Sequence, residues 1–432
     1  MFYPEAIQFL YDLRLFGAKF GLENTFQLAA FVGNPHQKLC FIHVAGTNGK
    51  GSTCAMLESV YRAAGLRTGL FTSPHLVSFR ERIQVNRRLI GEDDVVRLVK
   101  ELQPLLKHFP NGHHPTFFEV VTVMALKFFA EQKCDLVIWE TGLGGRLDAT
   151  NIVTPLASII TNIQFDHQQW LGNTLAQIAA EKAGIIKSGV PVITATDEPE
   201  ALAVIEKMAR EKNAPLKKVG QVSSLSWAGK MPALPLAGEH QKTNATLALA
   251  TVEILQKQIP VAEEKIRAGL QNVDWPGRLQ QVTLPVGRRI LLDGAHNPAG
   301  AKTLEAVLAK NFSAGKPVLI LGVLQDKDWQ HICETLAPLA ARIFTVPVSS
   351  ERSANPDELA EACRKINPSA EITACDCLDN ALEKSAGDGF VVITGSLYLV
   401  GESLEMLGLS PANGGERGLN EWAAPPAVLA DR

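Results

Sequence analysis

The stretch HVAGTNGKGST, residues 43–53, decides the fold class of this chain. It joins an apolar run at 40–46 to a segment with helical periodicity at 52–65. A glycine-rich turn between a strand and a helix lets backbone N–H groups surround oxygen anions, and the helix N-terminus adds its positive dipole end. The sequence therefore predicts a phosphate-binding loop made of Thr47, Asn48, Gly49, Lys50, Gly51 and Ser52.

The spacing of this loop departs from the usual G-x-x-x-x-G-K-[ST] pattern. Only two residues separate Gly46 from Gly49, and Gly51 follows Lys50 directly. Lys50 supplies a point charge to the β- and γ-phosphates, and a hydroxyl at Ser52 or Thr53 can approach a metal ion or a phosphate oxygen. A glycine-rich turn without special function is the alternative, and the strand before it and the helix after it favour the phosphate site.

Short apolar runs alternate with helical segments along the first part of the chain. The runs are continuous rather than alternating, which is typical of parallel strands that helices cover on both faces. This pattern predicts an α/β fold whose N-terminal domain holds the phosphate loop on a mainly parallel sheet. The expected strands are 40–46, 68–74, 134–140, 156–163 and 190–195, with helices at 52–65 and 118–132 among others.

A second alternation predicts a smaller, Rossmann-like α/β domain. A stretch with Gly and Pro, at 274–289, interrupts the periodicity before it. The expected strands are 289–295, 317–323, 342–348, 371–376 and 390–396, and Asn355 is the expected cap of a helix at 356–366. The predicted organisation is a domain with the phosphate loop at 1–275, identified below as ATP-binding from a family resemblance, a linker at 276–288, the second domain at 289–409 and a mobile tail at 410–432.

Composition narrows the class of protein and its compartment. The 432 residues include 42 Lys plus Arg and 45 Asp plus Glu, a formal charge of −3 that gives no support for nucleic-acid binding. No secretory signal and no uncharged apolar stretch of about 18 residues is evident, so we expect neither export nor a membrane span. The seven cysteines are scattered, which favours free thiols and a cytoplasmic location.

A carboxylate stands where a nucleotide site needs one for magnesium. Glu140 ends the apolar run 134–140, and parallel strands bring their carboxyl ends to one edge of the sheet. A carboxylate there can bind Mg²⁺ directly or through water. An ordinary glutamate at a strand end is the alternative.

Four motifs in order resemble those of the Mur ligase family. They are GTNGKGS at 46–52, FTSPHL at 71–76, ETGLGGRLDATN at 140–151 and DGAHNP at 293–298. Within that family the chain is most similar to folylpolyglutamate synthases, in particular to the bifunctional dihydrofolate synthase/folylpolyglutamate synthases of bacteria. The resemblance extends to TGSLYLVGE at 394–402 and leaves only the tail uncovered.

The resemblance implies an ATP-dependent amide ligase that adds L-glutamate to dihydropteroate and to reduced folates. A substrate carboxylate takes the γ-phosphoryl group of ATP, and the amine of glutamate then displaces phosphate from the acyl phosphate. Because both reactants are anions, positioning and positive charge carry most of the catalysis. The implied cofactors are ATP and two Mg²⁺ ions, and the implied state is a monomer.

The resemblance also assigns roles to residues of this sequence. Lys50, Lys182 and His296 are implied in catalysis, with Lys182 as a candidate for carbamylation by CO₂. Ser73, Glu140 and His167 are implied as metal ligands, and Asn244, Arg278 and Asp293 join the phosphate loop in binding ATP. The implied pterin site consists of Thr116, Phe117, Phe118, Glu119, Leu147, Asp148 and Ala149, and we expect glutamate near Ser396 and Tyr398.

Several alternatives remain open from the residues themselves. Phe117 and Phe118 begin an apolar helix and serve equally well as core, and His167 and Lys182, taken alone, are ordinary strand-end and helix-surface residues. A synthase that acts only on folates is the nearest alternative function, and a Mur ligase acting on a muramyl peptide fits the FTSPHL and TFFE segments less well. From other classes, a P-loop kinase or NTPase and a non-catalytic nucleotide-binding module remain.

Overall fold

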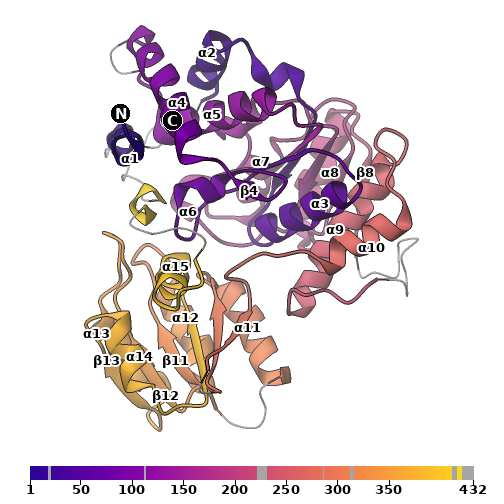
Figure 1. Ribbon diagram of the computed structural model, residues 1–432. Helices are drawn as coiled ribbons and strands as arrows, with labels where there is room; N and C mark the ends of the chain where they lie inside the picture. The colour runs from indigo at the N-terminus through magenta and orange to yellow at the C-terminus, as the bar shows by residue number, and fades with distance from the viewer. Residues whose placement is uncertain are drawn as a thin grey trace.

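The computed structural model describes residues 1–17, 21–110, 113–220, 231–285, 287–311, 316–410 and 416–420. Two sheets, each with helices on both faces, lie one above the other (Figure 1). The predicted α/β class is confirmed, and the phosphate loop follows a strand of the larger sheet. No helix within the described ranges is both long and apolar enough to span a membrane.

The larger sheet has eight strands in the order β4-β3-β2-β5-β1-β6-β7-β8. Strands β2, β5, β1, β6, β7 and β8 are parallel, whereas β3 and β4 form an antiparallel edge. The strand order reverses around β1, which lies between β5 and β6, and open α/β sheets bind ligands at such a point. The strands are β1 (Phe41–Ala45), β2 (Thr68–Phe71), β3 (Ile83–Val85), β4 (Arg88–Leu89), β5 (Leu136–Glu140), β6 (Ala157–Ile160), β7 (Val192–Thr194) and β8 (Leu216–Lys218).

The smaller sheet has six strands in the order β13-β12-β11-β14-β10-β9. Five are parallel, and β9 pairs antiparallel with β10. The strands are β9 (Gln280–Thr283), β10 (Arg289–Asp293), β11 (Val318–Leu321), β12 (Arg342–Thr345), β13 (Glu371–Ala374) and β14 (Phe390–Thr394). Strand β9 corrects the predicted linker 276–288, because Gln280–Thr283 is an edge strand of the second sheet and its half-exposed, polar sequence carries no strand signal.

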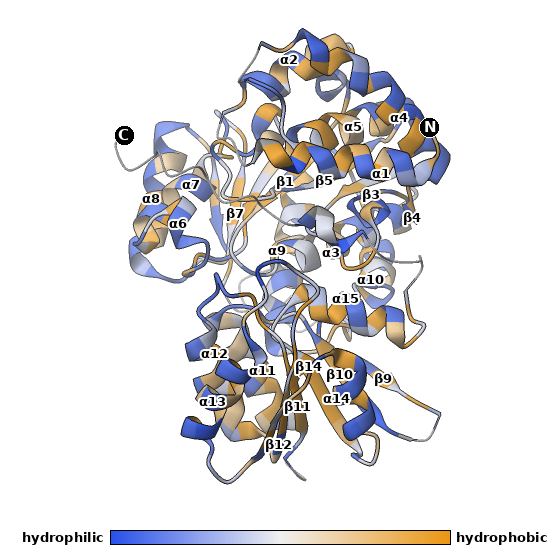
Figure 2. Cartoon of the chain, turned by 90° about the vertical axis from the view of Figure 1, so that its left-hand side faces the viewer, coloured by the Kyte–Doolittle hydropathy of each residue, from blue (hydrophilic) through white to orange (hydrophobic). Residues whose placement is uncertain are grey.

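Burial on both faces explains the continuous apolar strands. In β5, Val137 and Trp139 face a core shared with α5, whereas Leu136 and Ile138 face the core under α3. Because strand side chains alternate between faces, both sides of β5 must be apolar. Figure 2 shows the hydrophobic colours concentrated on the strands and on the inner sides of the helices. The short strands β3, β4 and β8 were missed because they are two or three residues long and rich in polar side chains.

Fifteen α-helices are present in the part of the chain that the structure describes. The predicted cap Asn355 is confirmed, since its side chain accepts a hydrogen bond from the backbone N–H of Asp357 at the start of α13. The helices are α1 (Tyr3–Asp12), α2 (Glu23–Phe31), α3 (Lys50–Ala63), α4 (Glu92–Leu102), α5 (Phe117–Glu131), α6 (Gln168–Leu171), α7 (Leu175–Ala183), α8 (Pro199–Glu211), α9 (Glu239–Leu255), α10 (Glu263–Gln271), α11 (Pro298–Asn311), α12 (Trp329–Leu336), α13 (Pro356–Ile366), α14 (Leu378–Lys384) and α15 (Leu397–Met406).

The segment 416–420 differs from the predicted mobile tail. Arg417–Asn420 forms a short 3₁₀ turn, η8, and the side chain of Asn420 is buried. The tail was predicted from its composition and lack of periodicity, and contacts made by a few scattered residues, such as Glu416 and Asn420, leave no periodic pattern in a sequence. The rest of the predicted tail, apart from Ser410, lies outside the described residues.

Candidate active site

One cavity of about 520 Å³ lies between the carboxyl ends of the two sheets. This volume falls within the range of small-molecule sites. Every residue predicted above as catalytic, nucleotide-binding, metal-binding or pterin-binding lines this cavity, and so do Ser396 and Tyr398. The fold therefore brings together residues that lie as far apart in sequence as Thr47 and Tyr398.

The phosphate loop occupies the turn between β1 and α3. Gly49 caps the helix with a φ of 83°, and the helix start has no side-chain cap, so its first N–H groups are available to an anion. A Cβ on Gly49 would lie 2.4 Å from Asn244 Oδ1, and one on Gly51 would lie 2.7 Å from the Trp275 ring. Only glycine fits at both positions, which explains the unusual spacing of the motif.

Two lysines converge on one carbonyl oxygen of this loop. Lys182 Nζ donates to Gly46 O at 2.8 Å, and Lys50 Nζ donates to the same oxygen at 3.2 Å. Lys182 projects from α7, is buried, and therefore is not the helix-surface lysine that the sequence left open. Burial and then the nearby Lys50 charge lower the pKa of Lys182 to about 7, so a large share of its amine is neutral near neutral pH.

Glu140 lies at the end of β5, directly across from the phosphate loop. Its Oε2 accepts a hydrogen bond from the backbone N–H of Ser73 at 3.1 Å, and the residue is only 4% exposed. Burial raises the pKa of its carboxyl to about 7, while Lys50 and the Ser73 N–H act in the opposite direction. A buried carboxylate of this kind, bonded to the Ser73 backbone, suits a hard divalent cation, which would replace the proton.

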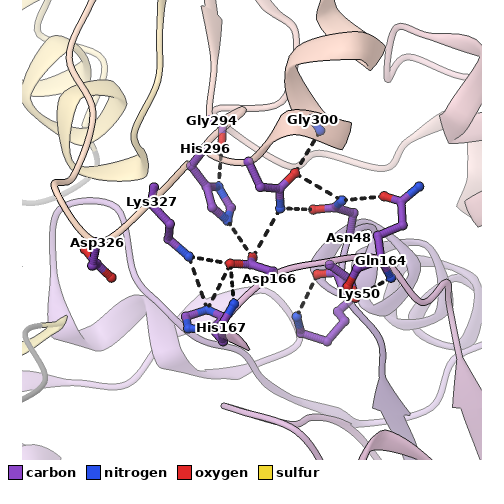
Figure 3. A network of polar contacts seen from close by, with 12 residues as sticks. Asn48, Lys50, Gln164, Asp166, His167, Gly294, His296, Gly300, Asp326 and Lys327 are labelled. Carbon is purple, nitrogen blue, oxygen red and sulfur yellow. Dashed lines mark hydrogen bonds and ion pairs between the residues drawn. The ribbon is translucent and has the colours of Figure 1, made fainter. Parts of the chain in front are cut away.

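A polar network connects the two domains on the other side of the loop (Figure 3). Asp166 Oδ1 accepts a hydrogen bond from Lys327 Nζ at 2.6 Å, and Asp166 Oδ2 accepts one from Asn297 Nδ2 at 3.2 Å. Asn297 Nδ2 also lies 3.1 Å from Asn48 Oδ1, which ties the network to the phosphate loop. Burial opposes ionisation of Asp166, but the Lys327 ammonium beside it holds the pKa of its carboxyl well below the usual value.

His167 and His296 face this network from opposite domains. His167 Nε2 lies 3.4 Å from Lys327 Nζ, and burial, followed by the Lys327 charge, lowers the pKa of its imidazole to about 3, against the pull of Asp166. A neutral imidazole is the form that coordinates a cation. His296 Nδ1 donates to Gly294 O at 2.7 Å, which leaves Nε2 on the side of Asp166 Oδ2, at 3.7 Å.

Hinge residues line the wall where the second domain begins. Asp293 accepts hydrogen bonds from the backbone N–H groups of Leu279 and Ala295, at 2.9 and 3.0 Å. Both of its carboxylate oxygens therefore hold the hinge to the loop after β10. Arg278 lies alongside, and burial lowers its pKa while Asp293 and Glu140 raise it. Asn244 is oriented by Gln241, whose Oε1 accepts from Asn244 Nδ2 at 3.0 Å.

The candidate pterin wall combines core residues with residues that reach the cavity. Phe117 is 8% exposed and packs in an edge contact with Phe79, whereas Phe118 is less buried and its ring covers Gly142. Thr116 and Glu119 form a capping box at the start of α5. Phe118 is thus the better candidate for ring stacking, and Phe117 belongs mainly to the core.

The facing edge comes from the loop after β5. Asp148 caps η5 (Ala149–Ile152), and its Oδ2 accepts from the N–H of Leu143 at 2.8 Å. Burial raises the pKa of the Asp148 carboxyl. Leu147 is half-buried and Ala149 is buried. Together with Asp148, these residues define the shape of this side of the cavity more than its charge.

Sequence reasoning missed several residues that line the cavity. They include Asp166, which directly precedes His167, and Lys327, which follows β11; a search of all strand ends for charged residues could have found both. Arg14, Gly17 and Gly21 come from the N-terminal segment, where no motif marked them. Arg82 and Asn420 also line the cavity, and nothing local in the sequence connects them.

Comparison with known proteins agrees with this geometry. The Mur ligase middle domain matches residues 44–252, and the glutamate ligase domain of Mur ligases matches residues 277–397. The dihydrofolate synthase/folylpolyglutamate synthase of Bacillus subtilis is 36% identical over 422 residues, covering 93% of this chain and 98% of that protein. The chain belongs to the Mur ligase family. Like other Mur ligases of the folate branch, it is an ATP-dependent ligase that forms C–N bonds.

Other relatives in this branch of the Mur ligases are similar in sequence and structure. The Escherichia coli dihydrofolate synthase/folylpolyglutamate synthase is 34% identical, covering 90% of this chain and 91% of that protein. A crystal structure of folylpolyglutamate synthase from Thermotoga maritima superposes with a TM-score of 0.83 at 35% identity, covering 96% of this chain and 98% of that one. A structure of E. coli FolC in complex with DHPP and ADP also has a TM-score of 0.83, at 30% identity, covering 94% and 98% of the two chains.

Proposed function

We propose that this Mur ligase joins L-glutamate to dihydropteroate, forming dihydrofolate, and to reduced folates, forming polyglutamates. The observation that carries the proposal is a single cavity in which the phosphate loop, Glu140 and the aromatic wall at Phe118 meet. Its relatives are named for both activities, and one was solved with DHPP and ADP. The cytoplasm, where ATP and L-glutamate are abundant, is the proposed compartment.

The reaction has two steps that the cavity can hold in order. A carboxylate oxygen of the pteroate attacks the γ-phosphorus of ATP, and the bond to the ADP oxygen breaks. The amine of glutamate then attacks the acyl carbon, phosphate leaves, and the amine nitrogen loses its proton. The Lys50 ammonium neutralises charge on the transferring phosphoryl group, and the N–H groups at the start of α3 hold the oxygens in place.

Charge at the cavity wall explains why a metal ion fits the reaction. Seven basic and seven acidic side chains line the cavity, so its own charge does not favour several anions at once. We assign Ser73, Glu140 and His167 as the residues that would hold magnesium, because each offers a donor at the same edge of the sheet. Bound there, Mg²⁺ would neutralise phosphate charge and polarise the phosphorus–oxygen bond.

Lys182 and His296 have distinct proposed roles beside this site. The partly neutral amine of Lys182 is the form that adds to CO₂, and the resulting carbamate carries two oxygens in place of a cation. His296 is held with Nε2 toward Asp166, so this nitrogen can accept the proton that the attacking amine loses. Ser396 and Tyr398, at the start of α15, form the proposed side of the cavity for glutamate.

ADP release from purified protein with ATP, Mg²⁺ and L-glutamate tests the proposal. We expect turnover with dihydropteroate and, separately, with tetrahydrofolate, and none when glutamate is left out. Turnover with tetrahydrofolate alone would restrict the protein to folylpolyglutamate synthesis. ADP release that ignores glutamate would indicate a kinase or an NTPase instead.

A further inference from the structure

The segment Glu416–Asn420 returns from the second domain to the first. It follows α15 in the chain and lies between α15 and α1, as the yellow turn in Figure 1 shows. Arg417 forms an ion pair with Glu405 of α15, and η8 contacts α1, where a Cβ added to Gly418 would lie 3.0 Å from the ring of Tyr11. The segment thus bridges the two domains at one side of the cavity.

Hydrogen bonds fasten this segment to the loop after β2. Glu416 Oε2 accepts from Ser78 Oγ at 3.0 Å and from the backbone N–H of Phe79 at 2.6 Å. His75 Nε2 donates to Glu416 O at 3.0 Å. The loop so held also contains Ser73, whose N–H binds Glu140.

Asn420 ends the segment and contacts a buried arginine. It is 5% exposed, its Oδ1 accepts a hydrogen bond from Arg82 Nη2, and its Nδ2 donates to His75 O at 2.9 Å. Arg82 Nε donates to His75 Nδ1 at 2.9 Å. The guanidinium is therefore held by two uncharged groups, the Asn420 amide and the His75 imidazole. The pKa of His75 is far below its usual value because of burial and the neighbouring Arg82 charge.

Arg82 is a buried cation without a directly ion-paired carboxylate among the residues that the structure describes. It is 3% exposed, forms no ion pair with any residue that the structure describes, and its guanidinium lies 5.4 Å from the Phe117 ring. Burial lowers its pKa to about 10, which leaves it charged at neutral pH. A buried, unpaired charge is costly unless a ligand compensates it.

Both Arg82 and Asn420 line the cavity, and Nη1 of Arg82 has no hydrogen-bond partner among the described residues. Tyr398, Glu81 and Glu140 favour the charged form of the guanidinium, and Glu140 and Tyr398 line the same cavity as Arg82. A guanidinium in this position can bind a carboxylate through two parallel hydrogen bonds.

We propose that Arg82 binds a carboxylate of the substrates and that Asn420 is a positioning residue that orients the Arg82 guanidinium toward the cavity. The inference rests on the proposed function, because that function supplies the carboxylates. Two sources share this chemistry: the carboxylate of the pteroate or folate, and a carboxylate of the incoming L-glutamate. In either case the C-terminal segment completes a substrate pocket in the first domain.

The test compares Arg82→Met, Asn420→Ala and their combination with wild type in the full chain. Arg80→Met is the matched control, because Arg80 lies in the same turn, binds Ile90 O and Glu92, and does not line the cavity. The first readout is the affinity for dihydropteroate against its carboxamide, measured by calorimetric titration with Mg·ADP present. The second is the KM for L-glutamate.

If Arg82 binds the pteroate carboxylate, wild type binds dihydropteroate more tightly than its carboxamide. In Arg82→Met and in Asn420→Ala this ratio of affinities should fall at least tenfold. If it takes a glutamate carboxylate, the preference is unchanged and the KM for L-glutamate rises at least tenfold. In both cases KM for ATP stays within about twofold, which a general structural defect would not give. The effects of the two substitutions should be non-additive in the combined variant, since Asn420 acts through Arg82.

Unchanged carboxylate preference together with unchanged KM for glutamate in Arg82→Met overturns the proposal. An effect of Arg82→Met that Asn420→Ala lacks overturns the role of Asn420. Thermal unfolding and ADP affinity separate these results from misfolding, since a folded variant keeps both. Wild type that turns over no folate substrate contradicts the proposed function itself, which the variants do not test.

Discussion

Lys327 of the second domain and Asp166 of the first form a buried ion pair, with Nζ 2.6 Å from Oδ1 and both side chains less than one-tenth exposed. The pair joins the loop after β11 to the loop after β6, beside the phosphate loop. Domain docking and the candidate nucleotide site therefore share the same residues. Substitutions in this pair should affect catalysis through the docked state of the two domains.

Lys327→Met leaves a buried carboxylate without its ammonium partner, and we expect it to weaken domain docking by about 3 kcal/mol. The expected results are a larger radius of gyration by small-angle X-ray scattering and at least a tenfold loss of kcat. Lys218→Met is the control, because its pair with Glu206 is 2.8 Å long but exposed and should contribute about 0.5 kcal/mol. An unchanged radius of gyration in Lys327→Met would contradict the role of the Lys327–Asp166 pair in domain docking.

Lys50→Met should abolish ligation without unfolding the protein. Among the residues that the structure describes, the Lys50 ammonium donates hydrogen bonds only to the carbonyl oxygens of Gly46 and Thr47, so its removal should leave the loop in place. We expect kcat for ADP release to fall at least 100-fold, with a melting temperature near that of wild type. Lys207→Met, at an exposed position, is the control and should leave kcat unchanged.

Magnesium binding should weaken as pH falls below 7. The pKa of Glu140 is about 7 in the folded chain, above its ordinary 4.5, so the proton competes with the cation below pH 7. The stabilisation by Mg·ADP in thermal unfolding should be larger at pH 8 than at pH 6, with affinity falling up to about tenfold per pH unit. Glu140→Gln should show a smaller stabilisation without this pH dependence; a slope equal to that of wild type would exclude Glu140 as the titrating group.

Lys182 should make the protein more stable as pH rises from 7 to 10.5. Its folded pKa is about 7 against an ordinary 10.5, so in this window the unfolded chain binds a proton that the folded chain does not. Urea unfolding in CO₂-free buffer at pH 7.5 and 9.5 should show this rise in wild type and lose it in Lys182→Met, where Lys50 still satisfies Gly46 O. Lys182→Met should also lower kcat at least tenfold, with partial rescue by short carboxylates if a carbamate is used.

Gly49→Ala should impair nucleotide binding far more than Gly65→Ala, the same substitution at another glycine with a positive φ. Gly49 has a φ of 83° and a Cβ there would lie 2.4 Å from Asn244 Oδ1. Gly65 has a similar φ of 92° but open space around it, so Gly65→Ala adds only backbone strain of about 1 kcal/mol. We expect KM for ATP to rise at least tenfold in Gly49→Ala and to stay unchanged in Gly65→Ala. Equal KM values for ATP in the two variants would argue against a close approach between Gly49 and Asn244.

Local patterns predicted most of the fold. All ten strands expected from apolar runs are present, because strands buried on both faces must be apolar throughout, as in Val137–Trp139. Strand β9 and the short edge strands were missed, since an exposed edge places little demand on side chains. The turn between β1 and α3 was equally predictable, because seven consecutive residues contain its glycines, its lysine and its helix start.

By itself, the sequence determined the α/β class, the glycine-rich turn between a strand and a helix, and the candidate residues that line one cavity. The tertiary structure alone decided which of them act together. Asp166 and Lys327 are 161 residues apart, and Arg82 and Asn420 are 338 apart, so no local periodicity couples them. Such pairs form only when the two sheets and the returning segment 416–420 dock, and that docking depends on the three-dimensional packing of the whole chain.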